Sequence, residues 1–444
     1  MLFTVILVLL ALRSDALPFL RPGEEPSRIH AVLMAGVPGG IHDAMNNAMN
    51  VNVARMYHQL LDRGVPAANI IVFLNDDITN NPELNPFPGH LYTGPERKKD
   101  WREGVLVDYT SFDINVENYI AVLTSNAENL NLTKGGSGRV LKSGPHDRVF
   151  ILHSSHGADG LICVNLHGMT KKQLHDTFDQ MISKKLFSEL TFYLSACQSG
   201  SMFADDMERF PTIYGLTGAL PNQFEIMFGY TAQVDGRNIT TGKYGEFFNA
   251  LYNELLNSAA TELLSEQFEE VRSKVKASTV TQYGNLSITK QPIGDFEGPQ
   301  QPPSTSEPTA FRSVENTDGK IKRPYPFSLY EDRLAEIDPN SNEAQELKEK
   351  IKYFEDKQKE VREIAIKVLG KITTQEHLHS LLDLPSPQIT NNDCHHKVAT
   401  SIFDHCSEVM NTPFIGELLR PLIHLCERGD SAQKLVSAVK LECH

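Results

Sequence analysis

Two residues capable of nucleophilic chemistry each stand at the end of an apolar run of the sequence. His156 follows the run 148–155, and Cys197 ends the run 189–197. A nearby imidazole lowers the pKa of a thiol and carries protons during acyl transfer, so the two residues together suggest a thiol nucleophile with its base. Glycine follows each of them closely, which would leave the N–H groups of Gly157 and Cys197 free to hold an oxyanion. On these residues alone, a small buried cysteine at a strand end remains the alternative.

Short apolar runs alternate with amphipathic stretches between His30 and Leu264. The alternation predicts an α/β fold with a mostly parallel sheet that is flanked by helices on both faces. Ligand chemistry in such sheets lies outside the carboxyl ends of the strands, where His156 and Cys197 are expected. The expected strands are 30–36, 69–75, 148–155, 189–197 and 212–216, and the expected helices are 47–63, 116–126, 170–183 and 246–264.

The composition excludes several classes of protein. The 444 residues contain 42 Lys and Arg against 56 Asp and Glu, a formal net charge of −14, which argues against broad attraction to nucleic acid or anionic membranes. The hydrophobic fraction of 40% and the charged fraction of 22% are typical of a chain that folds in water. This length predicts two or three folded units.

The first residues indicate export. The apolar run 2–12 is short for a membrane span and precedes Ala16, which predicts a cleaved secretory signal over 1–16; a retained signal anchor or a buried strand are the alternatives. Passage through the secretory pathway would make three asparagines in Asn-x-Ser/Thr motifs candidates for glycosylation. They are Asn131, Asn238 and Asn285.

The cysteines divide the chain into two parts. Four of the six lie in the last 51 residues: Cys394, Cys406, Cys426 and Cys443. In an exported chain this cluster suggests two disulfides in a small terminal domain, whereas a zinc site that includes neighbouring histidines lacks any Cys-x-x-Cys pair. A stretch of about 291–326 that is rich in Pro, Gly and Ser is predicted to be the linker before this domain. Apolar residues at helical spacing over 347–368 predict that the terminal unit is all-helical.

Several motifs together resemble one family. Ser-His-Gly at 155–157 and Ala-Cys-Gln-Ser-Gly-Ser-Met at 196–202 place the two candidates 41 residues apart, as in the legumain (asparaginyl endopeptidase) family of caspase-like cysteine peptidases. Segments 63–78, 107–110 and 116–124 match as well, and 394–443 resembles the legumain prodomain. The catalytic subunit of the glycosylphosphatidylinositol transamidase shares the front half but not this tail.

The resemblance implies a domain plan and roles for individual residues. It implies a caspase-like peptidase domain over 27–290, a linker or activation peptide over 291–340 and a helical prodomain over 341–444. Cys197 would be the nucleophile and His156 the acid and base, with Asn46 orienting the histidine. The implied disulfides are Cys394–Cys426 and Cys406–Cys443. Cys163 has no implied role and is interpreted as a buried thiol.

The substrate pocket departs from the family pattern. At the positions of the family's Arg-His pair this chain has Ala48 and Met49, and Ser195 replaces an acidic residue. Glu246, after Gly245, stands where the family has an aspartate. An asparagine side chain needs both donors and acceptors in its pocket, so strict preference for asparagine is not expected. Ser155 also replaces the acidic residue that precedes the histidine in many legumains.

The expected function is that of a cysteine endopeptidase made as a zymogen, hydrolysing peptides through a thioester. By resemblance the tail covers the site until cleavage at Asn340 or Asn342, which could instead be incidental asparagines of a hinge. The alternatives are a weak or inactive homologue that binds peptides or peptidases, and transpeptidation. Expected partners are peptide and protein substrates, the chain's own prodomain and cystatin-like inhibitors, without nucleic acid, membrane span, metal or cofactor. The expected location is the lysosome, the endosome or outside the cell.

Overall fold

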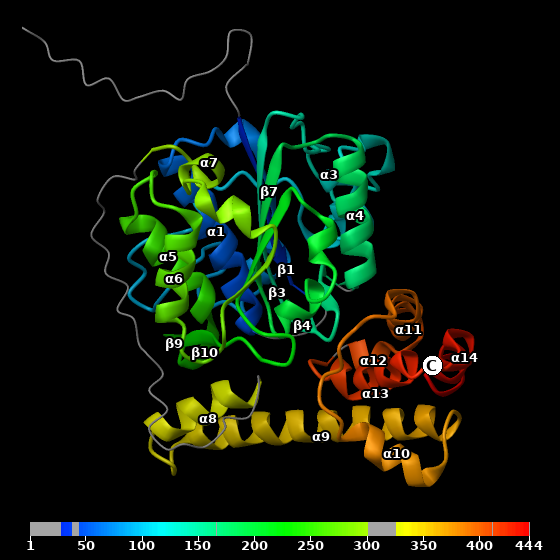
Figure 1. The fold of residues 1–444 in the computed structure, drawn as a ribbon. Helices are drawn as coiled ribbons and strands as arrows, with labels where there is room; N and C mark the ends of the chain where they lie inside the picture. Colours follow the sequence, from blue (N-terminus) through cyan, green and yellow to red (C-terminus); the bar gives the residue numbers. More distant parts are fainter. Residues whose placement is uncertain (1–27, 38–43, 166, 301–325, 411, 444) are drawn as a thin grey trace, which may run out of the picture.

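A six-stranded sheet forms the centre of the larger domain in the computed structural model, which describes residues 28–37, 44–165, 167–300, 326–410 and 412–443 (Figure 1). The strand order is β11-β8-β7-β3-β1-β2, and every neighbouring pair is parallel except β11 with β8. The bounds are β1 Ile29–Gly36, β2 Ile70–Phe73, β3 Arg148–Ser155, β7 Glu189–Ser195, β8 Ile213–Thr217 and β11 Thr281–Gly284. The predicted α/β class and mostly parallel sheet are confirmed.

Helices cover both faces of this sheet, as continuously apolar strands require. On one face lie α1 (Asn47–Asp62), α5 (Glu246–Asn257) and α6 (Leu264–Lys274), whose apolar side chains share one core with the sheet. On the other face lie α3 (Val116–Leu123) and α4 (Lys171–Ser183), which form a second core with it. The sheet is therefore the middle layer of three.

The predicted helix 246–264 is too long at its end, because α5 ends at Asn257 and α6 begins only at Leu264. A buried arginine from α1's end accounts for the break. Arg63 Nη1 donates to the backbone carbonyls of Leu255 and Ser258, at 3.1 and 3.4 Å. These carbonyls are used by a side chain from a distant part of the sequence, so the chain can leave the helix there without losing hydrogen bonds.

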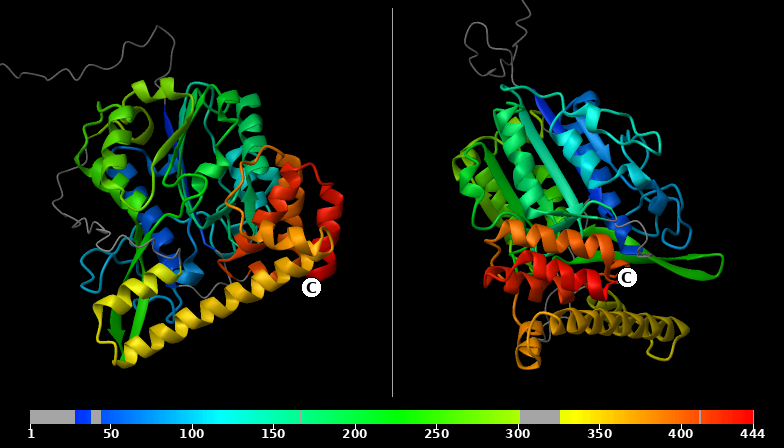
Figure 2. Two further views of the ribbon diagram at one scale, coloured as in Figure 1. Left: turned by 60° about the horizontal axis from the view of Figure 1, so that its bottom comes forward. Right: turned by 90° about the vertical axis from the view of Figure 1, so that its right-hand side faces the viewer.

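Two smaller sheets lie near the carboxyl edge of the main sheet. One consists of β4 (Gly157–Ala158), β5 (Leu161–Cys163) and β6 (Gly168–Thr170). The other is the hairpin of β9 (Met227–Val234) and β10 (Arg237–Gly245), which extends away from the body (Figure 2). Its turn, Asp235-Gly236, has φ of 49° and 78°, as a tight hairpin turn requires.

The larger domain extends beyond residue 290, its predicted end. Helix α7 (Gly294–Glu297) follows, with the side chain of Glu297 fully buried. The backbone N–H of Gln300 still bonds to the carbonyl of Arg63, at 3.0 Å. The predicted linker 291–340 is therefore too long at its start, and it also includes helix α8 (Phe327–Glu336) near its end. The predicted signal 1–16 and residues 301–325 lie outside the described residues.

The C-terminal part is all-helical, as predicted. Its helices are α9 (Asn342–Gly370), α10 (Gln375–Leu382), α11 (Asn392–His405), α12 (Ser407–Met410), α13 (Ile415–Glu427) and α14 (Ala432–Glu442), and we call them the tail domain. The long helix α9 runs beneath the bundle, while α11 packs against α4 and β6 of the larger domain (Figures 1 and 2). One apolar core joins the tail domain to Ala158 and Leu161 of β4 and β5.

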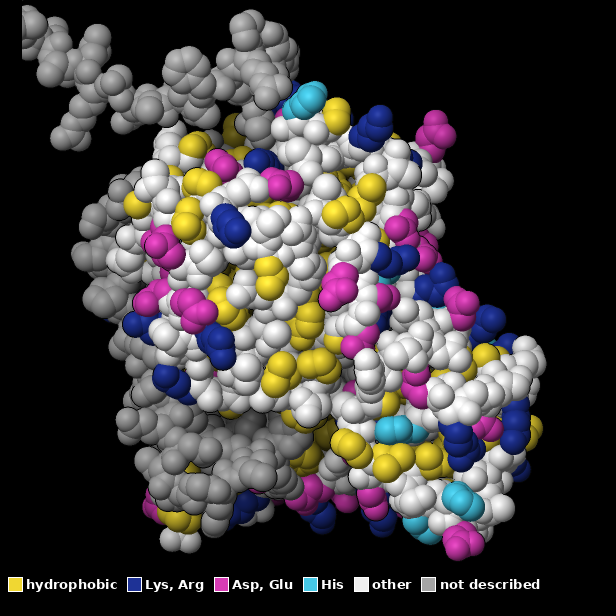
Figure 3. Space-filling view, in the orientation of Figure 1, with side chains coloured by type: hydrophobic (Ala, Val, Ile, Leu, Met, Phe, Trp, Pro, Cys, Tyr) yellow, Lys and Arg dark blue, Asp and Glu magenta, His cyan; other side chains and the backbone are white. Residues whose placement is uncertain are grey.

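On the face seen in Figure 3, acidic and basic side chains are interspersed and form no continuous basic area. No helix within the described ranges is long and apolar enough to cross a membrane.

Candidate active site

The sheet register brings the ends of β3 and β7 together. Ser154 pairs with Ser195, so His156 and Cys197 follow two neighbouring parallel strands at the same edge. The loops that carry them are in direct contact: a Cβ added to Gly157 would lie 2.2 Å from the carbonyl oxygen of Cys197. The structure therefore places both residues at one edge of the sheet, as expected. The close contact also leaves no room for a side chain at position 157.

Asn46 orients the histidine from the short turn Ala44–Asn46 that leads into α1. Its side chain is completely buried, and its Oδ1 lies 2.9 Å from His156 Nε2. A carbonyl oxygen only accepts hydrogen bonds, so Nε2 carries the ring proton and Nδ1 keeps the lone pair. This arrangement leaves the second ring nitrogen able to act as a base.

The backbone turns sharply directly after the candidate nucleophile. Gln198 has φ of +53°, in the left-handed region, and Ser199–Met202 then form a short 3-10 helix. The turn is fixed by the Gln198 N–H, which bonds to the carbonyl of Gln223 at 2.6 Å. The strain at a non-glycine residue beside a cysteine is typical of a functional turn. The oxyanion role of the Gly157 and Cys197 N–H groups stays a prediction.

Burial keeps both candidate groups neutral in this state. The Cys197 thiol donates to the carbonyl of Glu225 at 3.6 Å, and burial raises its pKa to about 12. Burial also lowers the pKa of His156 to about 4. In the described state the thiol and the imidazole are therefore both neutral, rather than a thiolate and an imidazolium.

The predicted pocket residues do not all lie where the resemblance implies. Met49 belongs to the apolar core under α1, and Ala48 packs against Gly242 of β10, whose added Cβ would lie 2.9 Å from the Cβ of Ala48. The carboxylate of Glu246 accepts hydrogen bonds from the backbone N–H groups of Lys276 and Ala277, at 3.2 and 3.0 Å. These bonds hold a loop, and the charge of Glu246 acts on Glu225 beside Cys197; its role in a substrate pocket stays a prediction.

The residue that sequence reasoning missed is Glu225. Ser195, a predicted pocket residue, donates from its Oγ to Glu225 Oε1 at 2.7 Å. Burial raises the pKa of this carboxyl to about 8, with a further contribution from the nearby Glu246. Glu225 lies between Phe224 and the apolar start of β9, and only the long-range fold brings it to Cys197. A charged residue within an apolar stretch was the one available signal.

Cys163 lies beside the histidine without a catalytic contact. Its backbone N–H bonds to the carbonyl of His156 at 3.0 Å, and its thiol is free. Burial raises its pKa to about 12. The residue is partly exposed, so its interpretation as a buried thiol holds only in part, while its raised pKa is that of an unreactive thiol.

The tail domain contacts the residue next to the nucleophile. Gln198 Nε2 donates to Asp159 Oδ1 at 2.8 Å and to Ser386 Oγ of the tail at 2.9 Å. Arg420 of α13 bonds to the other oxygen of Asp159 at 3.2 Å, where the Asp159 side chain is 1% exposed. His395 of α11 donates from Nε2 to the carbonyl of Asp159 at 3.0 Å. The tail is thus fastened to the turn between β4 and β5, beside the Cys197 loop.

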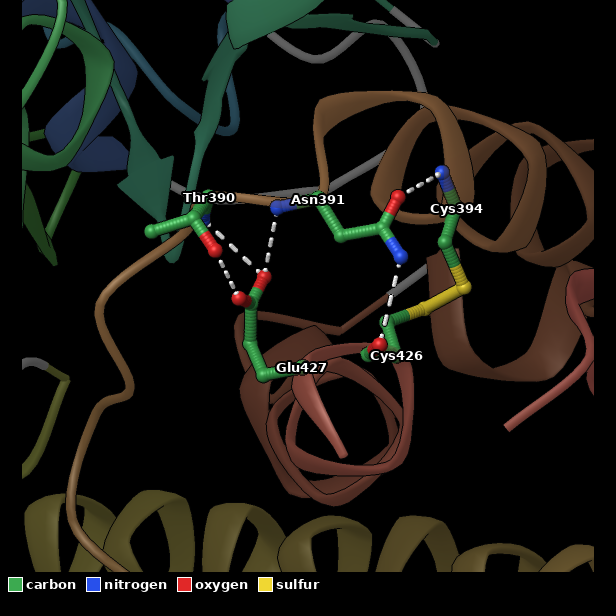
Figure 4. The surroundings of a disulfide bond; sticks show 5 residues. All are labelled: Thr390, Asn391, Cys394, Cys426 and Glu427. Carbon is green, nitrogen blue, oxygen red and sulfur yellow. Dashed lines mark hydrogen bonds between the residues drawn. A yellow bond between two sulfur atoms is a disulfide. The ribbon is translucent and has the colours of Figure 1, made fainter. Parts of the chain in front are cut away.

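Two disulfides hold the tail domain together, Cys394–Cys426 and Cys406–Cys443, which is the pairing that the resemblance implies. Since all four sulfurs are bonded, none can be a zinc ligand, and no group of residues in the described parts could hold a metal ion. Around the first disulfide, Asn391 caps α11 and also donates to the carbonyl of Cys426 at 3.2 Å (Figure 4). Glu427 accepts from the N–H groups of Thr390 and Asn391.

The modification and cleavage candidates lie mostly at the surface. Asn131 and Asn238 are exposed, whereas Asn285 is half-buried and donates from its amide to the carbonyl of Pro211. Asn340 lies in the turn between α8 and α9, and Asn342 is the first residue of α9; both are exposed. Their modification or cleavage stays a prediction.

A buried asparagine, a histidine and a cysteine at one edge of a mostly parallel sheet, with a disulfide-bonded helical domain beside them, define a class of cysteine peptidase. The Peptidase C13 family model matches residues 30–299, and the chain belongs to this family. The resemblance to legumains that the motifs indicate is confirmed.

Relatives match along nearly the whole chain. Legumain of Bos taurus is 30% identical over 453 residues, covering 100% of this chain and 98% of the relative. Hemoglobinase of Schistosoma japonicum is 28% identical and covers 93% of this chain and 92% of its own length. The vacuolar-processing enzyme delta-isozyme of Arabidopsis thaliana is 26% identical over 93% of this chain and 90% of its own. Among solved structures, caspase-1 from Spodoptera frugiperda covers 62% of this chain and 91% of its own at 13% identity, with a TM-score of 0.34, too low to carry an argument.

Proposed function

We propose that this chain is a cysteine endopeptidase made as a zymogen, with Cys197 as nucleophile and His156 as base and acid. The observation that carries the proposal is the geometry of the histidine. Asn46 holds its Nε2 at 2.9 Å, and its loop touches that of Cys197. A binding protein has no need of an asparagine that fixes which nitrogen of a histidine is basic.

The proposed reaction is acyl transfer through a thioester. His156 Nδ1 takes the thiol proton as Cys197 Sγ attacks the peptide carbonyl, and the developing oxyanion is held by the N–H groups of Gly157 and Cys197. The imidazolium then gives its proton to the leaving amine as the C–N bond breaks, leaving a thioester on sulfur. Water, deprotonated by the same imidazole, hydrolyses the thioester and regenerates the thiol. An amine in place of water would give transpeptidation.

The tail domain acts in this proposal as an inhibitor in the same chain. Its support is the contact of Ser386 with Gln198, the residue after the nucleophile, and the ion pair of Arg420 with Asp159. Release of the tail admits water to the two loops, which lowers the pKa of the thiol and raises that of the imidazole toward their ordinary values. Cleavage at Asn340 or Asn342, in the exposed turn before α9, would free the tail.

The family relationship supports a secretory-pathway location, in a lysosome or endosome or outside the cell. A relative named a vacuolar-processing enzyme matches over 93% of this chain. The exposed Asn131 and Asn238 are available for glycosylation during such passage.

A second candidate function is that of a weak or inactive homologue that binds peptides or peptidases. The observation in its favour is the altered pocket, where Met49 is part of the core and Ala48 has no polar group. A site with these residues could hold a peptide without cutting it. The two candidates differ in whether Cys197 is an activated thiol.

The experiment compares wild type with Cys197→Ala. The purified full chain is held at pH 7.5 and at pH 5.0 with a mixed peptide library, before and after its linker has been cut by an added protease, and cleavage is followed by mass spectrometry. We expect cuts that depend on Cys197 and increase after the linker is cut, and labelling of Cys197 by a thiol-reactive peptide probe. If the two proteins cleave identically and the wild type is not labelled after the linker is cut, the peptidase proposal fails and the binding function takes its place.

A further inference from the structure

A cluster of polar side chains lies beside the nucleophile on the α1 face of the sheet. Asn52 Nδ2 of α1 donates to Ser154 Oγ at 3.0 Å, and Ser195 Oγ donates to Glu225 Oε1 at 2.7 Å. A Cβ added to Gly245 would lie 2.9 Å from Glu225 Oε1, 3.5 Å from Ser195 Oγ and 3.7 Å from Asn52 Nδ2. Glu225, Ser195 and Asn52 therefore converge on one point, with Ser154 bonded to Asn52, and we call these four residues the Glu225 cluster.

With the Glu225 carboxyl ionised, as a bound cation would favour, the cluster contains more hydrogen-bond acceptors than donors. Among the described residues, Glu225 Oε2 and Asn52 Oδ1 have no hydrogen-bond partner, although their side chains belong to residues that are 4% and 1% exposed. Such buried, unpaired polar atoms are costly unless a ligand satisfies them. The pKa of Glu225 is raised mainly by burial. The groups that shift it further are Ser195, Glu246 and a backbone N–H, and none of these groups is basic.

The cluster is placed to meet the substrate residue on the acyl side of the cut. Glu225 accepts the thiol hydrogen of Cys197 with its backbone carbonyl at 3.6 Å, and Ser195 precedes the nucleophile by two residues. A peptide carbonyl attacked by Cys197 lies next to the Cα that carries this side chain. The side chain therefore has the Glu225 cluster within reach, on the same face of the sheet.

We propose that the Glu225 cluster selects a basic side chain, lysine or arginine, on the acyl side of the scissile bond, with the Glu225 carboxylate as its charge partner and Asn52 Oδ1 as a further acceptor. The proposal rests on the proposed peptidase function and names its substrate class. Lysine and arginine carry only donors and a positive charge, which match two unpaired acceptors and a buried carboxyl. An asparagine would direct its own carbonyl toward these acceptors, and an aspartate would add a like charge.

The test measures kcat/KM for peptide–coumarin substrates that differ only at this residue: Lys, Arg, Asn, Ala and Asp. The protein is the full chain after its linker has been cut, with both fragments left in solution. We expect Lys or Arg to exceed Asn and Ala by about 100-fold in the wild type, as loss of a buried charge partner commonly costs. Glu225→Gln keeps an acceptor for Ser195 and should lower Lys and Arg by about 100-fold while leaving Asn and Ala within about threefold. Glu128→Gln, at an exposed carboxylate, is the control that changes the charge equally.

The outcomes separate this inference from the proposed function. Cleavage that prefers Asn or Ala, or a uniform loss for all substrates in Glu225→Gln, overturns the basic specificity and leaves the peptidase intact. If no substrate is cut and no thiol probe labels Cys197, the peptidase proposal fails. In that case, calorimetry of lysine and norleucine peptides with Cys197→Ala decides the inference: tighter binding of the lysine peptide supports the cationic pocket, and equal binding overturns it.

Discussion

His395 links the docking of the tail domain to pH. Its side chain is completely buried between the domains, and its Nε2 donates to the carbonyl of Asp159 at 3.0 Å. Its pKa is lowered from 6.5 to about 4, mainly by burial and also by the charges of His396 and Lys171, against the hydrogen bond to the Asp159 backbone and the charge of Glu427, which raise it. The docked state thus holds the neutral ring. Docking keeps its full contribution from this group above pH 6.5 and loses it progressively as the pH falls from 6.5 toward 4.

The magnitude follows from these two values. If the ring returns to its ordinary pKa of 6.5 when the tail is released, proton uptake at pH 5.0 favours the released state about 30-fold, or about 2 kcal/mol. His395→Gln keeps a donor for the Asp159 carbonyl but cannot be protonated in this range. The dissociation constant of the tail rises by some factor when the pH falls from 7.5 to 5.0. That factor should be about 30 times smaller in His395→Gln than in the wild type.

The assay requires a tail held without a covalent link. A protease site introduced within residues 301–325 is cut in the folded protein, and the dissociation constant of the tail is measured by biolayer interferometry from pH 7.5 to 5.0. His379→Gln, at an exposed histidine of α10, is the matched control and should follow the wild type. If wild type and His395→Gln show the same pH dependence, or if acid tightens docking, the reasoning from burial is wrong.

Two further substitutions test the contacts around the site. Arg420→Ala should leave the buried carboxylate of Asp159 without its cation and weaken tail binding by about 2–3 kcal/mol, or roughly 30- to 150-fold, in the same interferometry assay. Gly157→Ala should place a Cβ 2.2 Å from the carbonyl oxygen of Cys197, which must shift the loop; we expect a loss of about 2–3 kcal/mol, read as a fall of roughly 5 °C in Tm by calorimetry.

Each substitution has a control elsewhere in the chain. Arg428→Ala removes an arginine that pairs with Asp430 inside the tail domain, so tail binding should not change; equal effects of the two arginines would contradict the role of Arg420. Gly370 is the last residue of α9, and a Cβ added there would meet open space. Gly370→Ala should therefore leave Tm unchanged or slightly raised. A Gly157→Ala protein as stable as the wild type would refute the close contact of the two loops.

Local patterns predicted much of the larger domain. The strand 148–155 has the bounds of β3, and the helix 47–63 differs from α1 by one residue at its end, because apolar runs and helical spacing depend on neighbours along the chain. The hairpin of β9 and β10 was not predicted, although its Asp235-Gly236 turn carries a recognisable signal. The break within 246–264 had no such signal, because it depends on the side chain of Arg63 from nearly two hundred residues earlier.

The same division holds for the site. The sequence alone determined that a histidine and a cysteine follow two apolar strands, and family motifs pointed to Asn46 as the third residue. Tertiary structure decided that Glu246 holds a loop, that Met49 lies in the core and that Glu225 reaches Cys197. It also decided which tail residues meet Asp159. The physical reason is that strand and helix patterns arise from adjacent residues, whereas burial, pairing and pKa depend on side chains that only the folded chain brings together.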